Sequence, residues 1–198
     1  MNRRALFAAV AIAALFVPAL ASAAVEKYKI DPVHSDVGFT VRHIMSRVPG
    51  RFNQFEGDIQ IDPKDPTTLS FTGKIQATSI DTRNERRDGD LRSPNFFDAA
   101  TYPEITFVSK KTVQDGDHLK ATGDLTMRGV TKEITLDVEV LGFLGEKAGF
   151  EASGKINRKD FGIVWNRNLD QGGTLLSDDV DLLIRIEAQR DKGEQPQK

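Results

Sequence analysis

The chain has 198 residues, enough for one domain with a sizeable core, and it contains no cysteine. The absence of cysteine excludes disulfide bonds, thiolate metal sites and a cysteine nucleophile, so packing alone must hold the fold together. A formal net charge of −2 at pH 7 argues against a nucleic-acid-binding protein, which needs a basic face.

The first residues have the pattern of a secretory signal peptide. Asn2-Arg3-Arg4 is a short positive region, an apolar run follows from Ala5 to Val17, and Ala21-Ser22-Ala23 supplies small residues for cleavage. The run is too short for a membrane-spanning helix, although an uncleaved anchor is the alternative interpretation. We expect residues 1–23 to be removed after Ala23 and the mature protein to be exported.

Apolar and polar residues alternate along most of the remaining chain. Val37, Phe39 and Val41 face one way, whereas the residues between them are polar or small. This period of two is typical of strands with one buried and one solvated face. The alternation predicts eight or nine strands, over residues 26–31, 35–46, 50–62, 67–79, 103–113, 117–127, 131–142, 147–158 and 178–189.

Turn-forming residues separate these strands and predict antiparallel neighbours. They occur at 62–66, 115–117, 128–129 and 144–146. Within 50–62 the phase of the alternation slips, so we expect a β-bulge near Asn53 to Glu56.

Two longer connections interrupt the strands, one at 159–177 and one at 80–102. In the second, Ser93-Pro94 fits the start of a helix with Ser93 as the N-cap, which predicts a short helical insertion around 82–100. At least one residue of Phe96-Phe97 should be buried beneath this loop. The arginines and acidic residues that precede them alternate in sign, so we expect ion pairs among them rather than a basic patch.

Many antiparallel strands with one apolar face can form a sandwich or a closed barrel. An eight-stranded barrel has an interior just wide enough for side chains or for one ligand. Small residues lie among the large apolar ones at Gly38, Gly73, Ala77, Ala121, Gly123, Ala152 and Gly154. They either leave part of the interior unfilled, which would suit a lipid chain, or mark bends in the barrel wall.

No pattern indicates catalysis, because the sequence has no G-x-S-x-G elbow, no S-x-x-K and no glycine-rich phosphate loop. His34 and His43 lack the spacing of a metal site, although two histidines and a carboxylate could still converge in space. His34 follows Asp31-Pro32 and should fix that turn. His43 shares the phase of Val41 and should point inward, where a ligand head group could be its polar partner.

Four stretches in order carry a family pattern: YKIDPVHSDVGFTVRHIMSRVPGRFNQFEGDI (28–59), SIDTRNERRDGDLRSPNFFDAATYPEITF (79–107), GDLTMRGVTKEITLDVE (123–139) and GFEASGKINRKDFGI (149–163). With them the chain resembles the YceI-like family of exported lipid-binding proteins. The resemblance implies an antiparallel, lipocalin-like barrel and a homodimer. It also implies a pore that holds a long amphiphile, such as a polyisoprenoid, an isoprenoid quinone or a fatty-acid derivative.

The chain departs from the family pattern at one position of the charged stretch. Family members often read R-D-x-H-L there, whereas this chain has aspartate, Asp90, in place of the histidine, between Arg87 and Leu91. A carboxylate disfavours an anionic phosphate, so Asp90 favours a neutral head group such as a quinone or an amide.

These observations predict an all-β, antiparallel, lipocalin-like β-barrel of 8–9 strands, with a signal peptide at 1–23, a barrel domain at 24–190 and a polar tail at 191–198. We expect a periplasmic binding or carrier protein, not an enzyme, with no cofactor except a bound lipid or isoprenoid. The expected partners are this ligand, a second copy of the chain and, transiently, a membrane, but no nucleic acid. The alternatives are an enzyme or stress-response accessory acting on a lipid or quinone, and a ligand-free interaction module.

The candidate ligand-binding residues share the inward phase of their strands. They are Phe39, Val41, His43, Phe52, Phe71, Ile75, Phe107, Leu136, Val138, Phe150, Leu182 and Ile184. We predict no catalytic residue and no metal ligand.

Overall fold

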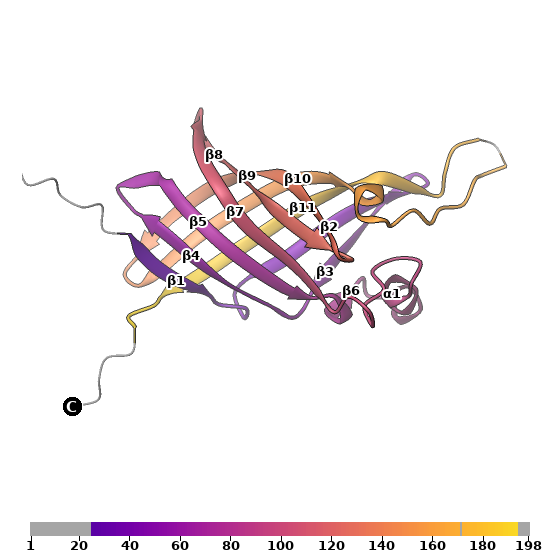
Figure 1. The fold of residues 1–198 in the computed structure, drawn as a ribbon, viewed down its shortest axis with the longest axis horizontal. Helices are drawn as coiled ribbons and strands as arrows, with labels where there is room; N and C mark the ends of the chain where they lie inside the picture. The colour runs from indigo at the N-terminus through magenta and orange to yellow at the C-terminus, as the bar shows by residue number, and fades with distance from the viewer. Residues whose placement is uncertain (1–24, 171, 194–198) are drawn as a thin grey trace, which may run out of the picture.

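The computed structural model describes residues 25–170 and 172–193 (Figure 1). The predicted signal peptide at 1–23 lies outside the described residues, as does the end of the predicted polar tail, 194–198. In the described part of the chain, no helix is long and apolar enough to cross a membrane.

Strands dominate the described chain, and every pairing between them is antiparallel. The strands are β1 (Glu26–Ile30), β2 (Asp36–His43), β3 (Ser46–Phe52), β4 (Phe55–Asp62), β5 (Asp65–Gln76), β6 (Ile80–Asp81), β7 (Glu104–Asp115), β8 (His118–Met127), β9 (Val130–Leu144), β10 (Lys147–Asn157) and β11 (Leu176–Arg190). The helical segments are η1 (Ala77–Ser79), α1 (Glu85–Arg92) and η2 (Arg158–Phe161).

Eight of the strands close into a ring in the order β1-β4-β5-β7-β8-β9-β10-β11, because β1 also pairs with β11. The closing pairing is short and places Ile30 opposite Ala188. β2 pairs with the same edge of β11, and this pairing begins where Asp36 lies opposite Arg185. β1 and β2 therefore act as one long, interrupted strand of the barrel, which Figure 1 shows as a tilted cylinder. The predicted antiparallel barrel is confirmed.

The strand predicted at 50–62 is divided into β3 and β4. The ladder breaks at Asn53 and Gln54, inside the segment where we expected a bulge; the Asn53 N–H donates to Ser79 O (3.1 Å), and Gln54 O accepts from Gln76 N (2.9 Å). The strand predicted at 35–46 ends earlier, because Ile44 and Met45 form a tight turn between β2 and β3. The four predicted turns lie between strands, as expected.

The helical insertion lies within the predicted 82–100, but the prediction that Ser93 begins the helix is wrong. α1 begins earlier, because the Asn84 side chain caps it by accepting from the Arg87 N–H (3.0 Å). Ser93 instead ends the helix with an extended backbone (φ −71°, ψ 167°). Pro94 explains this ending, because a residue that precedes proline is disfavoured in the helical conformation.

One end of the barrel is filled by a hydrophobic core. Tyr28, Ile61 and Ala121 are almost inaccessible to solvent there, and Leu119 lies on the same strand as Ala121. The Tyr28 ring packs 6.1 Å from that of Phe143, measured between centroids. The opposite end carries α1, η2 and the turn between β2 and β3 (Figure 1); we call this end the mouth.

Candidate ligand-binding cavity

The barrel encloses a cavity of about 780 Å³ that extends from the filled end to the mouth. All twelve candidate residues line it: Phe39, Val41, His43, Phe52, Phe71, Ile75, Phe107, Leu136, Val138, Phe150, Leu182 and Ile184. Their role in binding a ligand stays a prediction, but the structure brings all of them around one space.

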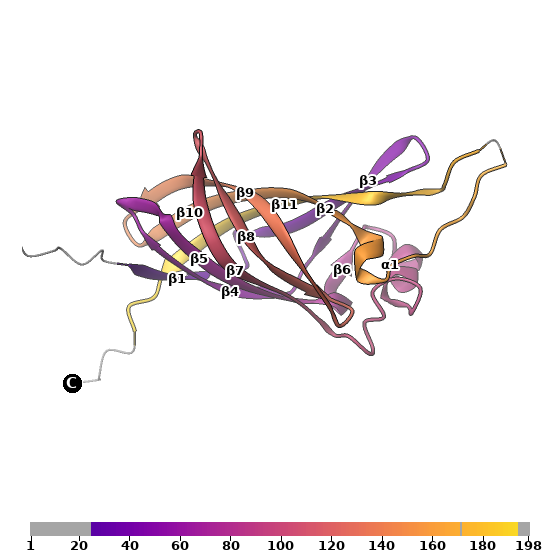
Figure 2. The same ribbon diagram turned by 45° about the horizontal axis from the view of Figure 1, so that its top comes forward.

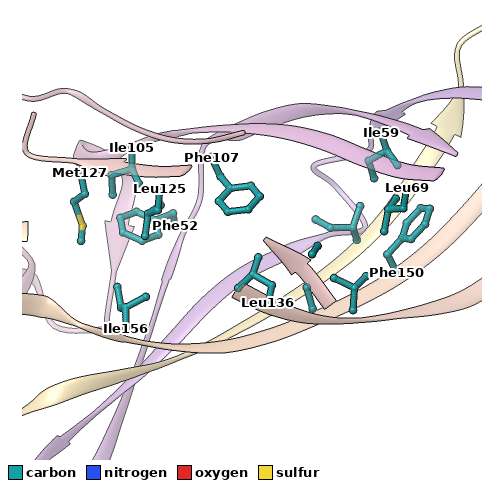
Figure 3. Close-up of a cluster of buried hydrophobic side chains, with 14 of the residues drawn as sticks. Phe52, Ile59, Leu69, Ile105, Phe107, Leu125, Met127, Leu136, Phe150 and Ile156 are labelled. Carbon is teal, nitrogen blue, oxygen red and sulfur yellow. The ribbon is translucent and has the colours of Figure 1, made fainter. Parts of the chain in front are cut away.

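Alternation along each strand directs these side chains inward. On β8, buried residues alternate with half-buried ones, and two of the buried residues, Leu125 and Met127, line the cavity. Figure 3 shows Phe107 and Leu136 on the inner side of the barrel, on different strands. The Phe107 ring stacks on that of Phe71, with centroids 5.2 Å apart. The resulting wall is apolar over most of its length.

Glycines explain why this interior is not filled. At Gly50 and Gly123 an added Cβ would lie 2.3 Å and 2.5 Å from the rings of Phe39 and Phe107, so each ring lies against glycine backbone in the wall. At Gly73 an added Cβ would have nothing within 4 Å, and this residue lines the cavity. Gly73 therefore agrees with the interpretation that small residues leave part of the interior unfilled, whereas Gly50 and Gly123 permit close packing of rings on the wall.

Aromatic side chains from the insertion reach into the cavity at its mouth. The Phe97 ring meets that of Phe52 edge-on at 5.7 Å, and the Phe96 ring lies 5.2 Å from that of Trp165, both measured between centroids. Phe96, Phe97 and Trp165 all line the cavity, and the two phenylalanines are half-buried. Our set of candidate residues omitted these three, although the Phe96-Phe97 pair in a polar loop was a usable signal.

Arginines hold the insertion against the barrel. Arg92 donates to Thr78 O (2.8 Å) and Ile80 O (2.9 Å), and Arg128 of the β8–β9 turn donates to Pro94 O (3.1 Å). The prediction of ion pairs within the charged stretch is wrong, because among the described residues no ion pair joins two members of 83–98. Backbone carbonyls at the ends of strands need donors, and the arginines supply them.

A buried arginine anchors the second connection, 159–177. Arg158 is 4% exposed and donates to Ser177 O (2.9 Å), Ile163 O (2.6 Å) and Trp165 O (2.8 Å). Burial lowers the pKa of its guanidinium from the ordinary value, and the charge of Asp178 partly offsets this. Since its donors are engaged by the protein, Arg158 positions Trp165 rather than offering a free charge to a ligand.

Polar groups that line the cavity gather at the mouth. Asp90 of α1 is exposed, and His43 at the end of β2 is half-buried, in agreement with its predicted inward phase. Within the described residues, no hydrogen bond or ion pair joins the His43 ring to a carboxylate. The mouth thus offers polar contacts to a head group, whereas the interior offers apolar ones.

His34 has the structural role expected of it. Its Nδ1 lies 2.7 Å from Asp31 Oδ2, and the Val33 N–H donates to Asp31 Oδ1 (2.9 Å), which fixes the turn before β2. The hydrogen bond with His34 lowers the pKa of the Asp31 carboxyl. Asp31, His34 and Glu187 bring ligand atoms within 4.8 Å of one another, but none of the three lines the cavity. His34 and His43 flank β2 at opposite ends and do not converge.

Known proteins share this architecture. A family model described as the YceI-like domain matches residues 28–188. The chain belongs to the YceI-like family. Protein YceI of Escherichia coli O157:H7 is 41% identical over 179 residues, which cover 86% of this chain and 91% of that relative. The matched residues begin in β1 and end in β11, so the family match covers the whole ring and both connections at the mouth.

Two solved structures have the same fold. The crystal structure of the Campylobacter jejuni YceI protein is 36% identical, with a TM-score of 0.66, and the match covers 83% of this chain and 97% of that one. A polyisoprenoid binding domain from Saccharophagus degradans is 17% identical, with a TM-score of 0.66, and the match covers 83% of this chain and 98% of that one. At this low identity, the second likeness concerns the fold alone.

Proposed function

We propose that the protein holds a long-chain amphiphile in its barrel and acts as a periplasmic binding or carrier protein. The observation that carries the proposal is the apolar cavity of about 780 Å³, closed at one end and polar at the other. A polyisoprenoid, an isoprenoid quinone or a fatty-acid derivative would place its chain in the interior and its head group at the mouth. The pattern of a signal peptide at 1–23 supports export.

Desolvation of the chain would supply most of the binding free energy. Burial of each methylene contributes about 0.8 kcal/mol, so ten methylenes contribute about 8 kcal/mol before the costs of association are subtracted. A cavity of about 780 Å³ lies within the usual range, about 300–1,000 Å³, for small-molecule sites.

The shared fold suits the same ligand class. The Saccharophagus degradans domain is described as polyisoprenoid-binding, and it has the same barrel. The exposed Asp90 carboxylate at the mouth favours a neutral head group, such as a quinone or an amide, over a phosphate.

We propose binding rather than catalysis as the role of the cavity. Glu56 and Lys74 of its lining pair with each other (2.6 Å), and the Arg158 donors are taken by backbone carbonyls and Asp178. An enzyme acting on the lipid would need an acid and a base that act together inside the barrel. The proposal includes no cofactor besides the lipid, and the homodimer expected from the family resemblance is tested by sedimentation.

Gentle purification from the periplasm, followed by organic extraction and mass spectrometry, tests the proposal. We expect one prenyl or acyl lipid class at close to one molecule per barrel. An empty barrel, together with no binding of added prenyl or acyl lipids, would rule the carrier function out.

A further inference from the structure

The β2–β3 hairpin extends beyond the barrel at the mouth and ends in two apolar residues. Figure 2 shows it projecting beside the connection between η2 and β11, away from the filled end. At its tip, Met45 is 95% exposed and Ile44 is 41% exposed. Exposed apolar residues that gather at one place mark contact sites more often than scattered ones do.

The backbone at this tip is strained. Ile44 has φ 53°, in the left-handed region that β-branched residues rarely adopt. A two-residue hairpin turn ordinarily uses glycine, asparagine or aspartate at this first loop position. In the β8–β9 turn the unbranched Arg128 (φ 53°) occupies the same position and Gly129 (φ 71°) follows it, so the β2–β3 turn differs in placing a β-branched residue there. Strained residues persist where the surrounding structure enforces them and gather at functional positions. Turn formation alone does not account for an isoleucine here.

Cationic residues flank the apolar tip. The segment 37–55 contains Arg42, Arg47 and Arg51 but no aspartate or glutamate. Arg47, whose side chain is 74% exposed, pairs with Asp181 at the base of the hairpin (2.7 Å), and Arg51 pairs with Asp81 (3.4 Å). Arg42 donates to Ile44 O (2.7 Å) and has no acidic partner among the described residues, so it places an uncompensated positive charge beside the tip. An apolar pair between exposed arginines is typical of segments that enter the interface of an anionic bilayer.

A second exposed segment continues this surface. The Ile44 N–H donates to Leu175 O (2.8 Å), and the Leu175 N–H donates to Arg167 O (2.8 Å), so three chain segments lie side by side. Two residues before Arg167, Trp165 is 37% exposed, and its ring lies tilted against that of Phe96 at the cavity entrance; its neighbour Val164 is 64% exposed. Tryptophan favours the membrane interface because its ring is apolar and its N–H is polar.

We propose that Ile44 and Met45, with Val164 and Trp165, dock the mouth of the barrel onto an anionic phospholipid bilayer. The proposal rests on the proposed lipid-binding function, because docking would bring the cavity entrance to the surface where its ligand resides. The flanking arginines would contact lipid phosphates, and the apolar tip would enter the interfacial region.

Vesicle flotation with the full mature protein tests the docking surface. The vesicles contain phosphatidylethanolamine with phosphatidylglycerol, and parallel vesicles of phosphatidylcholine test the need for anionic lipid. The double variant Ile44→Asn/Met45→Asp removes the apolar tip, and asparagine suits the left-handed turn position. Leu144→Asp is the matched control, because Leu144 is an 82% exposed leucine at the β9–β10 turn, away from the mouth.

We expect wild type and Leu144→Asp to float with the anionic vesicles and the double variant to bind on the order of tenfold more weakly. Trp165, the single tryptophan, should be quenched by brominated lipid in the bound protein. Equal flotation of the double variant and wild type would overturn the proposal. So would loss of self-association in the double variant with unchanged vesicle binding, since a second copy would then occupy the surface.

The cavity-filling variant Gly73→Phe separates this proposal from the lipid-binding function. If Gly73→Phe floats with the vesicles but contains no extractable lipid, docking does not depend on an occupied cavity, and the docking proposal is supported. Extractable lipid in a wild-type protein that does not float overturns docking and leaves the binding function intact.

Discussion

Two aromatic rings lie along the barrel wall because each covers a glycine. Phe39 lies over Gly50, and Phe107 lies over Gly123, at distances that leave no room for a Cβ. An aromatic side chain above a strand glycine covers exposed backbone, which compensates for the missing side chain. Because these rings are directed along the wall, the interior between them stays open.

Alanine substitution should therefore lower stability at a glycine that lies under a ring, but not at a glycine that faces open space. In Gly123→Ala the new Cβ would lie 2.4 Å from the Val108 carbonyl oxygen, so two strands must move apart. We expect a loss of about 1–3 kcal/mol in the free energy of unfolding, measured with urea. The matched substitution Gly73→Ala, with nothing within 4 Å, should change it by less than about 0.5 kcal/mol. Similar losses at both positions would contradict this packing.

Asp81 should make stability depend on pH near the mouth. The Arg83 N–H (2.8 Å) and then the Asn53 amide (3.4 Å) donate to its carboxylate and lower its pKa below the ordinary value of 3.8. A pKa that is lower in the folded state stabilises the protein above the unfolded value, and this contribution is lost as the pH falls through the folded value.

Asp81→Asn should thus be less stable than wild type at pH 7, and the difference should shrink below about pH 4. Urea unfolding at several pH values measures both free energies. A difference that grows towards acidic pH would mean that the carboxylate does not stabilise the fold.

Among the elements, α1 and the loop after it cover part of the mouth. Their contacts to the rest of the protein include hydrogen bonds from Arg92 and Arg128 to carbonyls and the Phe97–Phe52 and Phe96–Trp165 ring contacts. Solvent-exposed hydrogen bonds characterise segments that open before the rest of a protein. We expect ligand exchange to pass through this segment.

Arg92→Ala should loosen the insertion without disturbing the ring of strands. Loss of its bonds to Thr78 O and Ile80 O should cost about 1–2 kcal/mol and speed hydrogen exchange at the amides of 85–98. Glu85→Ala, an exposed substitution on the same helix, is the control. Unchanged exchange in 85–98 would show that Arg92 does not hold the insertion down.

The sequence predicted the strands well because alternation depends on local order alone. It placed all twelve candidate residues on the cavity wall, since each shares the inward phase of its strand. It missed the turn at Ile44, because isoleucine is a poor signal for a positive φ. It also missed Trp165, whose place depends on Arg158 and not on any repeat.

The residues alone left the open interior as one of two alternatives, and only the family resemblance implied a pore. It depends on which ring lies over which glycine, as in the pairing of Phe39 with Gly50 across β2 and β3. That pairing follows from the strand register, and the register was set by a turn that the sequence did not reveal. The helix start was predicted at Ser93, and Asn84, the residue that caps α1, was overlooked. Asn84 lies in a charged stretch without apolar periodicity, so no pattern marked it as a helix start.

At the scale of the whole molecule, the two ends of the barrel differ. One end is closed by Tyr28, Ile61 and their neighbours, and the other carries the polar groups, the α1 insertion and the projecting hairpin. An amphiphile would therefore enter and leave with its head group at the mouth. The proposed docking surface lies at this same end, where transfer to or from a bilayer would take place.

Native mass spectrometry of gently purified protein tests the central claim, that the interior holds a long-chain amphiphile, most directly. Wild type and Gly73→Ala should carry an additional mass of one lipid per barrel that is released on collisional activation. Gly73→Phe, whose ring would occupy the open space at Gly73, should lose most of this mass while retaining the fold. Wild-type protein that carries no lipid and takes up none from added prenyl or acyl compounds would contradict the claim, as would a folded Gly73→Phe with full occupancy.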